Sequence, residues 1–133
     1  MERLSPAMEN YLKVIYLVSG FGKKNSIRVQ DIASYMKLTK SSVSRAANFL
    51  SQKGLLKKGH YTTISFTETG KQQAQFIMEK HSIIQRFLCG VLAINDKLAE
   101  EDASNIGNVI SLECYKSICE YMEKYVSDAQ AYN

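Results

Sequence analysis

The stretch LTKSSVSRAANFLSQKGLLKKG, residues 38–59, has the pattern of a short helix with two unlike faces. One face is small and apolar and recurs at helical spacing, at Val43, Ala46, Ala47 and Leu50. The opposite face carries short hydrogen-bonding side chains and an arginine, namely Ser41, Ser42, Ser44, Arg45 and Asn48. Thr39 is a suitable N-cap and Gly54 a suitable stop. The pattern therefore predicts a helix over residues 40–53 that packs through its alanines and presents a polar face.

The segment before this helix predicts two more helices. Ser5-Pro6 is a typical helix start, because a capping hydroxyl is followed by proline at the first helical position. An apolar stripe continues from there, and the first helix should end at Gly20 or Gly22. After a short extended piece, a second helix is expected over 29–38, and a tight connection joins it to the helix of the quoted stretch.

The residues after the quoted helix change from helical to alternating periodicity. β-branched and aromatic residues alternate over 61–66, which predicts a small hairpin around a turn at Gly59. Helix, helix, short turn, helix and hairpin is the order of a winged helix-turn-helix, in which the third helix enters the DNA major groove.

Three further helices are predicted over 67–92, 94–111 and 112–125. They are rich in Leu, Ile and Tyr and carry no catalytic constellation, which favours a dimer interface. A two-fold dimer would present two recognition helices to DNA half-sites about one turn apart. The sequence thus predicts a mostly α protein, with a winged helix-turn-helix over 1–70 and a helical dimerisation domain over 71–133.

Charge is distributed unevenly along the 133 residues. Residues 1–70 hold 11 Lys and Arg against 4 Asp and Glu, a balance of +7, and residues 71–133 hold 6 against 9, a balance of −3. A basic front half is typical of a module that faces phosphates. Because no apolar run approaches the roughly 18 residues that cross a bilayer, and the N-terminus does not resemble a signal peptide, a cytoplasmic protein without membrane contact is expected.

The chemistry-bearing residue types point away from an enzyme. Cys89, Cys114 and Cys119 are odd in number and include no C-x-x-C pair, so small buried hydrophobes are their expected role. The two histidines, His60 and His81, lie far apart in the sequence, and no P-loop, G-x-S-x-G or paired Cys/His motif is present.

Ten residues of the front half are predicted to contact double-stranded DNA. Arg45 is expected to contact a base, preferably guanine, and Asn48 is the second candidate for a base contact. Phosphate anchors on the same helix are Lys40, Ser41, Ser42 and Ser44. The wing would meet the backbone or the minor groove through Lys57, Lys58, His60 and Tyr61. The alternative for these residues is a three-helix bundle with a solvated polar face.

Five short motifs carry a family resemblance. They are MENYLKVIYL in the first helix, RVQDIAS and KSSVSR in the helix-turn-helix, FTETGK after the wing, and EKHSIIQRFL in the long helix. With these motifs the chain resembles the iron- and manganese-dependent transcriptional repressors of the diphtheria toxin repressor type, nearest the short manganese-sensing branch without a C-terminal barrel domain. The match runs from Ser5 to Tyr125. It implies a dimeric DNA-binding regulator in which residues 71–133 include a remnant of the metal-sensing region.

The resemblance also implies where a metal would bind. The family's binding positions correspond here to Asn10, Lys13, His81, Ser104, Gly107 and Asn108. His81 is a side chain of the required type, whereas Lys13 would repel a divalent cation and Gly107 offers no side chain. A second site of some members corresponds to His81, Gln85 and Glu100. A small shift of the alignment would instead bring in Glu100, Glu101 or Asp102.

These substitutions favour a dimeric regulator that has lost metal control and needs no cofactor. In that interpretation the positive charge of Lys13 takes the place of the metal, opposite an acid such as Glu79 or Glu100. One alternative is a manganese- or iron-responsive repressor with displaced ligands. Another is a winged-helix protein-interaction module without DNA affinity, which salt-dependent DNA binding would distinguish from the other two.

Overall fold

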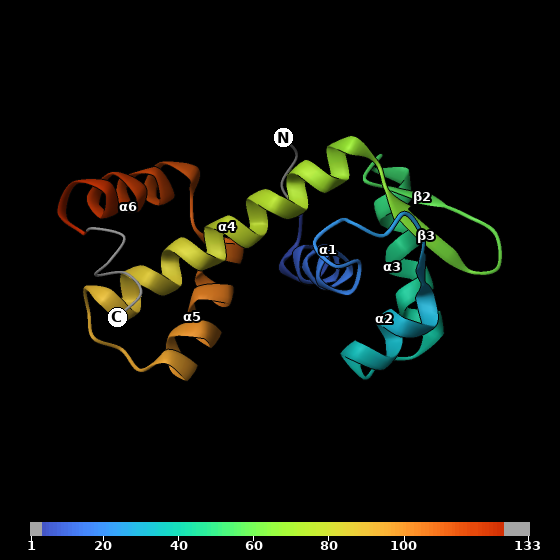
Figure 1. Cartoon of the computed structure of the whole chain (residues 1–133), viewed down its shortest axis with the longest axis horizontal. Coiled ribbons are helices and arrows are strands. Elements are labelled where there is room, and N and C mark those ends of the chain that lie inside the picture. The colour runs from blue at the N-terminus through green and yellow to red at the C-terminus, as the bar shows by residue number, and fades with distance from the viewer. Residues whose placement is uncertain (1–3, 127–133) are drawn as a thin grey trace. The chain divides into compact units, whose positions relative to one another are not determined.

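Over residues 4–126, which the computed structural model describes, the chain forms six helices and three short strands (Figure 1). It divides into two units, Met1–Phe76 and Ile77–Asn133, and the division falls inside the long helix α4, Glu68–Gly90. None of the described helices is both long enough and apolar enough to cross a membrane.

Unit 1 has the element order of a winged helix-turn-helix, as predicted. Its helices are α1, Pro6–Val18, α2, Val29–Met36, and α3, Lys40–Gln52, and it also contains the beginning of α4. Its strands are β1, Ile27–Arg28, β2, Leu56–Lys58, and β3, Thr63–Phe66. Helices α1 and α2 pack against each other and against α3, and the hairpin of β2 and β3, the wing, follows α3 directly (Figure 1).

The start signals in the sequence act as helix caps. The Ser5 and Thr39 hydroxyls each accept a hydrogen bond from the backbone N–H three residues further on, at 3.2 and 3.1 Å. Helix α1 ends before the two predicted glycine stops, because the chain already turns at Ser19. The buried Ser19 hydroxyl donates to the Tyr16 carbonyl at 2.7 Å and closes the last turn.

The apolar face of α3 lies in the core of unit 1. All four residues predicted for that face are buried, namely Val43, Ala46, Ala47 and Leu50. Fully buried side chains on the neighbouring helices are Leu12, Ile15 and Ile32. Because the two alanines add little bulk, α3 can lie close to α1 and α2. This packing leaves the polar face of α3 directed outward.

The strands of unit 1 form an antiparallel sheet in the order β1-β3-β2. Ile64 on β3 pairs with Ile27 on one side and with Lys58 on the other. The predicted two-stranded hairpin is present as β2 and β3, but its second strand begins at Thr63 and not at residue 61. Tyr61 and Thr62 have φ of 57°, so they form the tight turn instead of extending the strand, and β1 adds a third strand.

Unit 2 consists of the rest of α4 together with α5, Asp96–Val109, and α6, Leu112–Tyr125. These helices agree with the predicted ranges to within a few residues. Buried side chains of the three helices include Ile77, Ile84, Ala99, Ala103, Tyr115 and Met122. Leu98 on α5 and Leu112 on α6 are large apolar side chains that stay exposed, at 44% and 56%.

The interpretation of the cysteines as buried hydrophobes is wrong. Cys114 is exposed, and Cys89 and Cys119 are half-buried. Partial burial and a hydrogen bond from the thiol to Asp96 Oδ1 at 3.3 Å raise the pKa of Cys89. Burial and a hydrogen bond with the Cys119 thiol raise the pKa of Tyr115. Cys89 is thus held in the weakly reactive thiol form at neutral pH.

Candidate nucleic-acid interface

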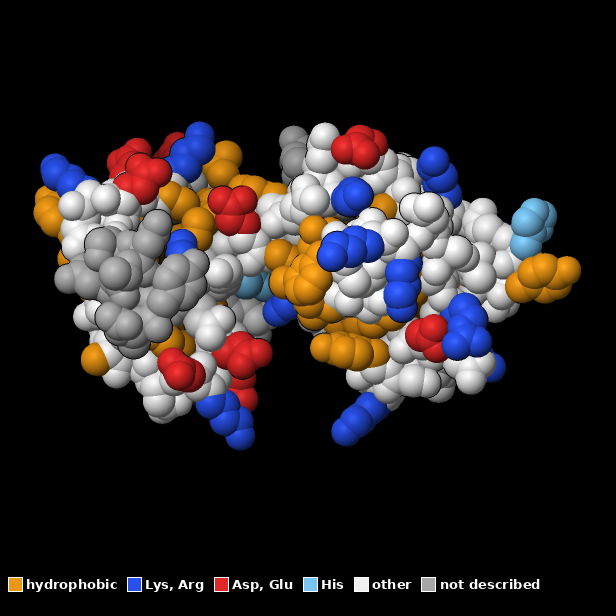
Figure 2. Space-filling model, in the orientation of Figure 1, with side chains coloured by type: hydrophobic (Ala, Val, Ile, Leu, Met, Phe, Trp, Pro, Cys, Tyr) orange, Lys and Arg blue, Asp and Glu red, His pale blue; other side chains and the backbone are white. Residues whose placement is uncertain are grey.

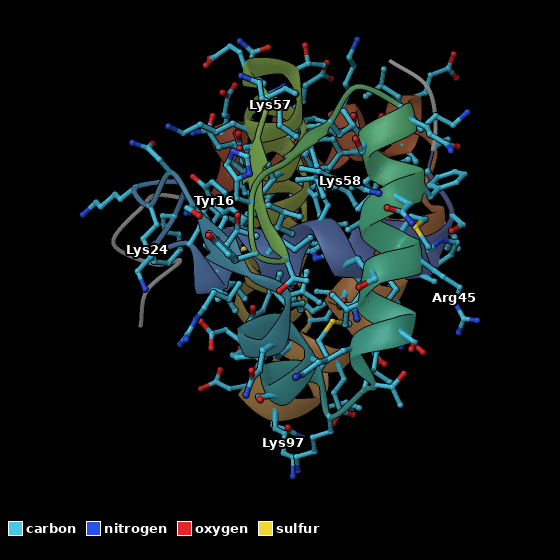
Figure 3. All side chains as sticks on the ribbon, turned by 90° about the vertical axis from the view of Figure 1, so that its right-hand side faces the viewer. Tyr16, Lys24, Arg45, Lys57, Lys58 and Lys97 are labelled. Atoms are coloured by element: carbon cyan, nitrogen blue, oxygen red, sulfur yellow. The ribbon has the colours of Figure 1, made fainter. Side chains whose placement is uncertain are left out.

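The polar face of α3 begins with a short chain of hydrogen bonds. Thr39 Oγ1 donates to Ser42 Oγ at 3.0 Å, and Arg45 Nη2 donates to the same oxygen at 3.5 Å. These bonds direct Arg45 towards the first turn of the helix, where free backbone N–H groups and the helix dipole also favour an anion. In Figure 3 the Arg45 side chain extends outward from α3. A guanidinium in this position can reach a base edge or a phosphate.

The structure divides the predicted α3 residues between two flanks of the helix. On the flank towards α1, a depression of about 300 Å³ is lined by Met8, Tyr11, Ser42, Arg45, Ala46 and Phe49. On the flank towards the wing, a groove of about 220 Å³ has Ser44, Asn48 and Lys58 among its lining residues. Lys40 and Ser41 are exposed in the first turn. Sequence periodicity placed these residues on one polar face and could not assign them to different flanks.

The wing carries its predicted contact residues at exposed positions. Lys57 and Lys58 lie on β2, and His60 and Tyr61 lie at the turn. Tyr61 is 94% exposed, and its ring centroid is 6.4 Å from that of His60. Thr63 Oγ1 donates to the His60 carbonyl at 2.7 Å and braces the turn. The wing therefore projects two rings and two ammonium groups from a braced hairpin.

Two further features of this surface were missed in the sequence. Arg28 lies beside the wing at the start of α2 and pairs with Asp31 at 3.2 Å, an exposed ion pair of little energetic weight. Phe49 is 40% exposed, although the apolar face of its helix, α3, lies in the core, and the Lys53 ammonium lies 5.5 Å from its ring centroid. The sequence signal for the depression towards α1 was therefore Phe49 itself, a large aromatic side chain outside the buried apolar face. On the face drawn in Figure 2, most charged side chains of unit 1 are blue.

In unit 2, the structure brings together His81 on α4 and Gly107 on α5. His81 is only 6% exposed. A Cβ atom built on Gly107 would lie 2.4 Å from His81 Cδ2 and 2.9 Å from Nε2. The Cδ2–Nε2 edge of the imidazole therefore lies directly against Gly107, where the resemblance implies a metal-binding side chain.

The remaining positions that the resemblance implies differ in exposure. Half-buried positions are Lys13, Gln85, Ser104 and Asn108. Exposed positions are Asn10, Glu100, Glu101 and Asp102. Within residues 4–126, no group of three or more His, Cys, Asp or Glu side chains is placed to hold a metal ion.

Comparison with known proteins matches both regions of the chain. Residues 3–64 match the family model of the iron dependent repressor N-terminal DNA binding domain, and residues 67–131 match that of the iron dependent repressor metal binding and dimerisation domain. An uncharacterised HTH-type transcriptional regulator of Methanocaldococcus jannaschii is 32% identical over 124 residues, which are 92% of this chain and 97% of the relative. The chain belongs to the iron-dependent repressor family.

More distant relatives and solved structures are also similar to this iron-dependent repressor family member. The HTH-type transcriptional regulator MntR of Lysinibacillus sphaericus is 24% identical, over 90% of this chain and 84% of its own. The structure of a hypothetical protein from Sulfolobus solfataricus superposes with a TM-score of 0.73 at 25% identity, over 91% of each chain. IdeR of T. acidophilum shares the fold, with a TM-score of 0.68 at 20% identity, over 92% of this chain and 56% of its own.

Two of the positions that the resemblance implies for a metal carry residues that do not ligate one. Manganese and iron need several oxygen or imidazole ligands. Position 13 is a lysine, whose ammonium group would repel a divalent cation, and position 107 is a glycine without a side chain. A carboxylate side chain at position 107 would in addition overlap the His81 ring.

Replacing Gly107 with alanine tests this packing. Alanine gains about 1 kcal/mol in helix propensity, but overpacking costs up to about 3 kcal/mol, so a net loss of about 1–2 kcal/mol in the free energy of unfolding is expected. In a His81→Ala background the ring is absent, and the same change should stabilise the protein. Urea denaturation at one protein concentration measures both effects. The same sign in both backgrounds would contradict the contact.

Proposed function

We propose that this protein is a sequence-specific DNA-binding transcription regulator that acts as a homodimer and binds its operator without a metal. Its place in a family of DNA-binding regulators supports the role in DNA binding and transcription. The packing of the His81 ring against Gly107 carries the proposal of metal-free binding, because the ring fills the space in which the resemblance implies a ligand side chain. As a regulator of transcription, it would act in the cytoplasm.

The DNA-binding part of the proposal is supported by the surface of unit 1. Arg45 on α3 is exposed, and the wing presents Lys58 on the side of the same helix and Lys57 on the other face of β2. Residues 1–70 carry the balance of +7. A basic surface that includes an outward-facing helix complements the phosphates and the major groove of a duplex.

The homodimer is supported by exposed apolar side chains of unit 2. The large ones are Leu92, Leu98, Val109, Leu112, Tyr121 and Tyr125. The Tyr121 ring centroid is 6.1 Å from that of Phe87 and 4.8 Å from that of Tyr125, so α4 and α6 together present three neighbouring aromatic rings. Monomeric proteins seldom leave large apolar patches open, and the matched family region is a dimerisation domain.

DNA binding in the absence of metal is the deciding measurement. The purified full chain is titrated against duplex DNA from upstream of its own gene and against a duplex selected from a random library, first with chelator and then with manganese or iron. We expect equal affinity in both conditions, since among residues 4–126 no group of three or more His, Cys, Asp or Glu side chains is placed to hold a metal ion. An affinity that rises tenfold or more with metal would favour a metal-responsive repressor with displaced ligands.

Failure to bind DNA under any of these conditions would favour the remaining alternative, a winged-helix module that binds proteins. Salt dependence separates a DNA-binding regulator from a protein-binding module, because each neutralised phosphate releases counterions and makes DNA binding weaker as salt rises.

A variant of Lys13 tests whether its charge takes the place of a metal. If the ammonium group does so, Lys13→Glu should lower the affinity for DNA. Lys13→Met then separates the effect of losing the positive charge from the effect of introducing a negative one.

A further inference from the structure

The groove between α3 and the wing has an apolar floor and a polar rim. Its volume is about 220 Å³. The floor includes Val29, Ala47 and Ile64, which are buried, and the rim includes Ser44, Asn48 and Lys58. Among the described residues that line this groove, none is acidic.

The register of the sheet places Lys58, and not Lys57, on the side of this groove. Lys58 pairs with Ile64, and directly opposed residues of an antiparallel pair share one face of the sheet. Lys57 pairs with Ser65 and points to the other face, since side chains alternate along a strand. Figure 3 shows Lys58 between the wing and α3, with Lys57 farther from α3.

The side of the groove formed by the wing is preorganised by backbone contacts within unit 1. The Thr62 carbonyl accepts a hydrogen bond from Val29 N–H at 3.0 Å, which ties the turn to the start of α2. A Cβ on Gly59 would lie 2.5 Å from Thr63 Oγ1, so the absence of a side chain at Gly59 permits this tight hairpin. A preformed wall lowers the ordering cost of binding.

The chemistry of the groove matches one unit of a DNA backbone. A lysine ammonium is a compact charge that binds phosphate, and the serine hydroxyl and asparagine amide are neutral donors for phosphate oxygens. The apolar floor suits the carbon atoms of a deoxyribose. If α3 lies in a major groove, a DNA strand that borders that groove would pass the flank of α3 on which the wing lies.

We propose that this groove binds one sugar–phosphate unit of the DNA, with Lys58 on the phosphate and Ser44 and Asn48 as its neutral donors. This proposal rests on the proposed DNA-binding function. It assigns Asn48 to the backbone instead of a base edge, and it separates the two flanks of α3. The wing-side flank positions the duplex, and the α1-side flank, with Arg45, reads the sequence.

The test compares Lys58→Gln with Lys57→Gln in the full chain, on a selected duplex and on a scrambled one. Lys58→Gln should weaken binding to both duplexes by a similar factor, about tenfold at low salt, and make the log–log salt slope less steep by about one. Lys57→Gln should change the slope by clearly less. Ethylation interference then locates the contact, because the phosphate whose ethylation blocks the wild type should lose its effect in Lys58→Gln alone.

The outcomes separate this proposal from the function on which it rests. Salt-dependent binding by the wild type together with an unchanged slope in Lys58→Gln overturns the groove assignment and leaves the DNA-binding function standing. Equal slopes in the two variants also overturn it, since any wing charge would then suffice. A wild type without salt-dependent DNA binding overturns both.

Discussion

Replacing Arg45 with alanine is expected to weaken binding to the selected duplex by about ten- to a hundredfold while changing binding to a scrambled duplex much less. The reason is the position of Arg45, which is exposed on the flank of α3 away from the wing. Its Nη2 donates a hydrogen bond to Ser42 Oγ at 3.5 Å. A guanidinium that contacts guanine bidentately contributes about 1–3 kcal/mol of discrimination against other bases. Fluorescence anisotropy with both duplexes at one salt concentration measures the two affinities.

Arg45→Lys is the matched control, because it keeps the charge and removes the planar pair of donors. We expect it to retain the affinity for scrambled DNA and to lose most of the preference for the selected duplex. Equal losses on the two duplexes in Arg45→Ala would instead identify Arg45 as a phosphate contact. Lys58→Gln should lose the same factor in affinity on both duplexes. The comparison then shows that the α1-side flank of α3 recognises the base sequence and that the wing-side flank positions the DNA backbone.

Local signals were sufficient to predict the order of elements in this fold. The Ser5 and Thr39 caps, the apolar spacing from Val43 to Leu50 and the change to alternating residues each depend on neighbours a few positions away. Such patterns specify where a helix starts and which face it buries. They therefore placed α3 correctly, together with the side of it that faces solvent.

Features that depend on residues distant in the chain were not predictable in this way. The pairing of Ile27 with Ile64 joins segments on either side of α2 and α3, and it makes the hairpin a three-stranded sheet. The left-handed turn at Tyr61 and Thr62 uses residue types that do not favour it, so composition predicted a strand there. The contact between His81 and Gly107 likewise joins two helices, and a glycine in α5 was read in the sequence simply as a missing ligand.

Replacing Gly70 with alanine is expected to lower the free energy of unfolding by about 3 kcal/mol, a large part of the stability of a small domain. A Cβ built on Gly70 would lie 1.8 Å from the Leu55 carbonyl oxygen and 2.7 Å from its carbonyl carbon. That same oxygen accepts a hydrogen bond from Thr67 N–H at 3.1 Å, and Thr67 Oγ1 donates to the Gly54 carbonyl at 2.6 Å. The first turn of α4 thus rests directly on the backbone that leads into β2.

Backbone atoms cannot move aside as a flexible side chain can, so the alanine must displace α4 or break these hydrogen bonds. Gly90→Ala, at the other end of the same helix, is the matched control, because nothing lies within 4 Å of a Cβ built there. It should leave stability unchanged or raise it by up to about 1 kcal/mol. Urea denaturation followed by circular dichroism compares the two variants. A Gly70→Ala protein as stable as Gly90→Ala would contradict the close approach of Gly70 to the Leu55 backbone.

The Gly70→Ala change should also reduce DNA binding. Because Gly54 and Leu55 lead into β2, a displaced α4 would shift the wing. This connects the glycine of the FTETGK motif to the DNA-binding surface.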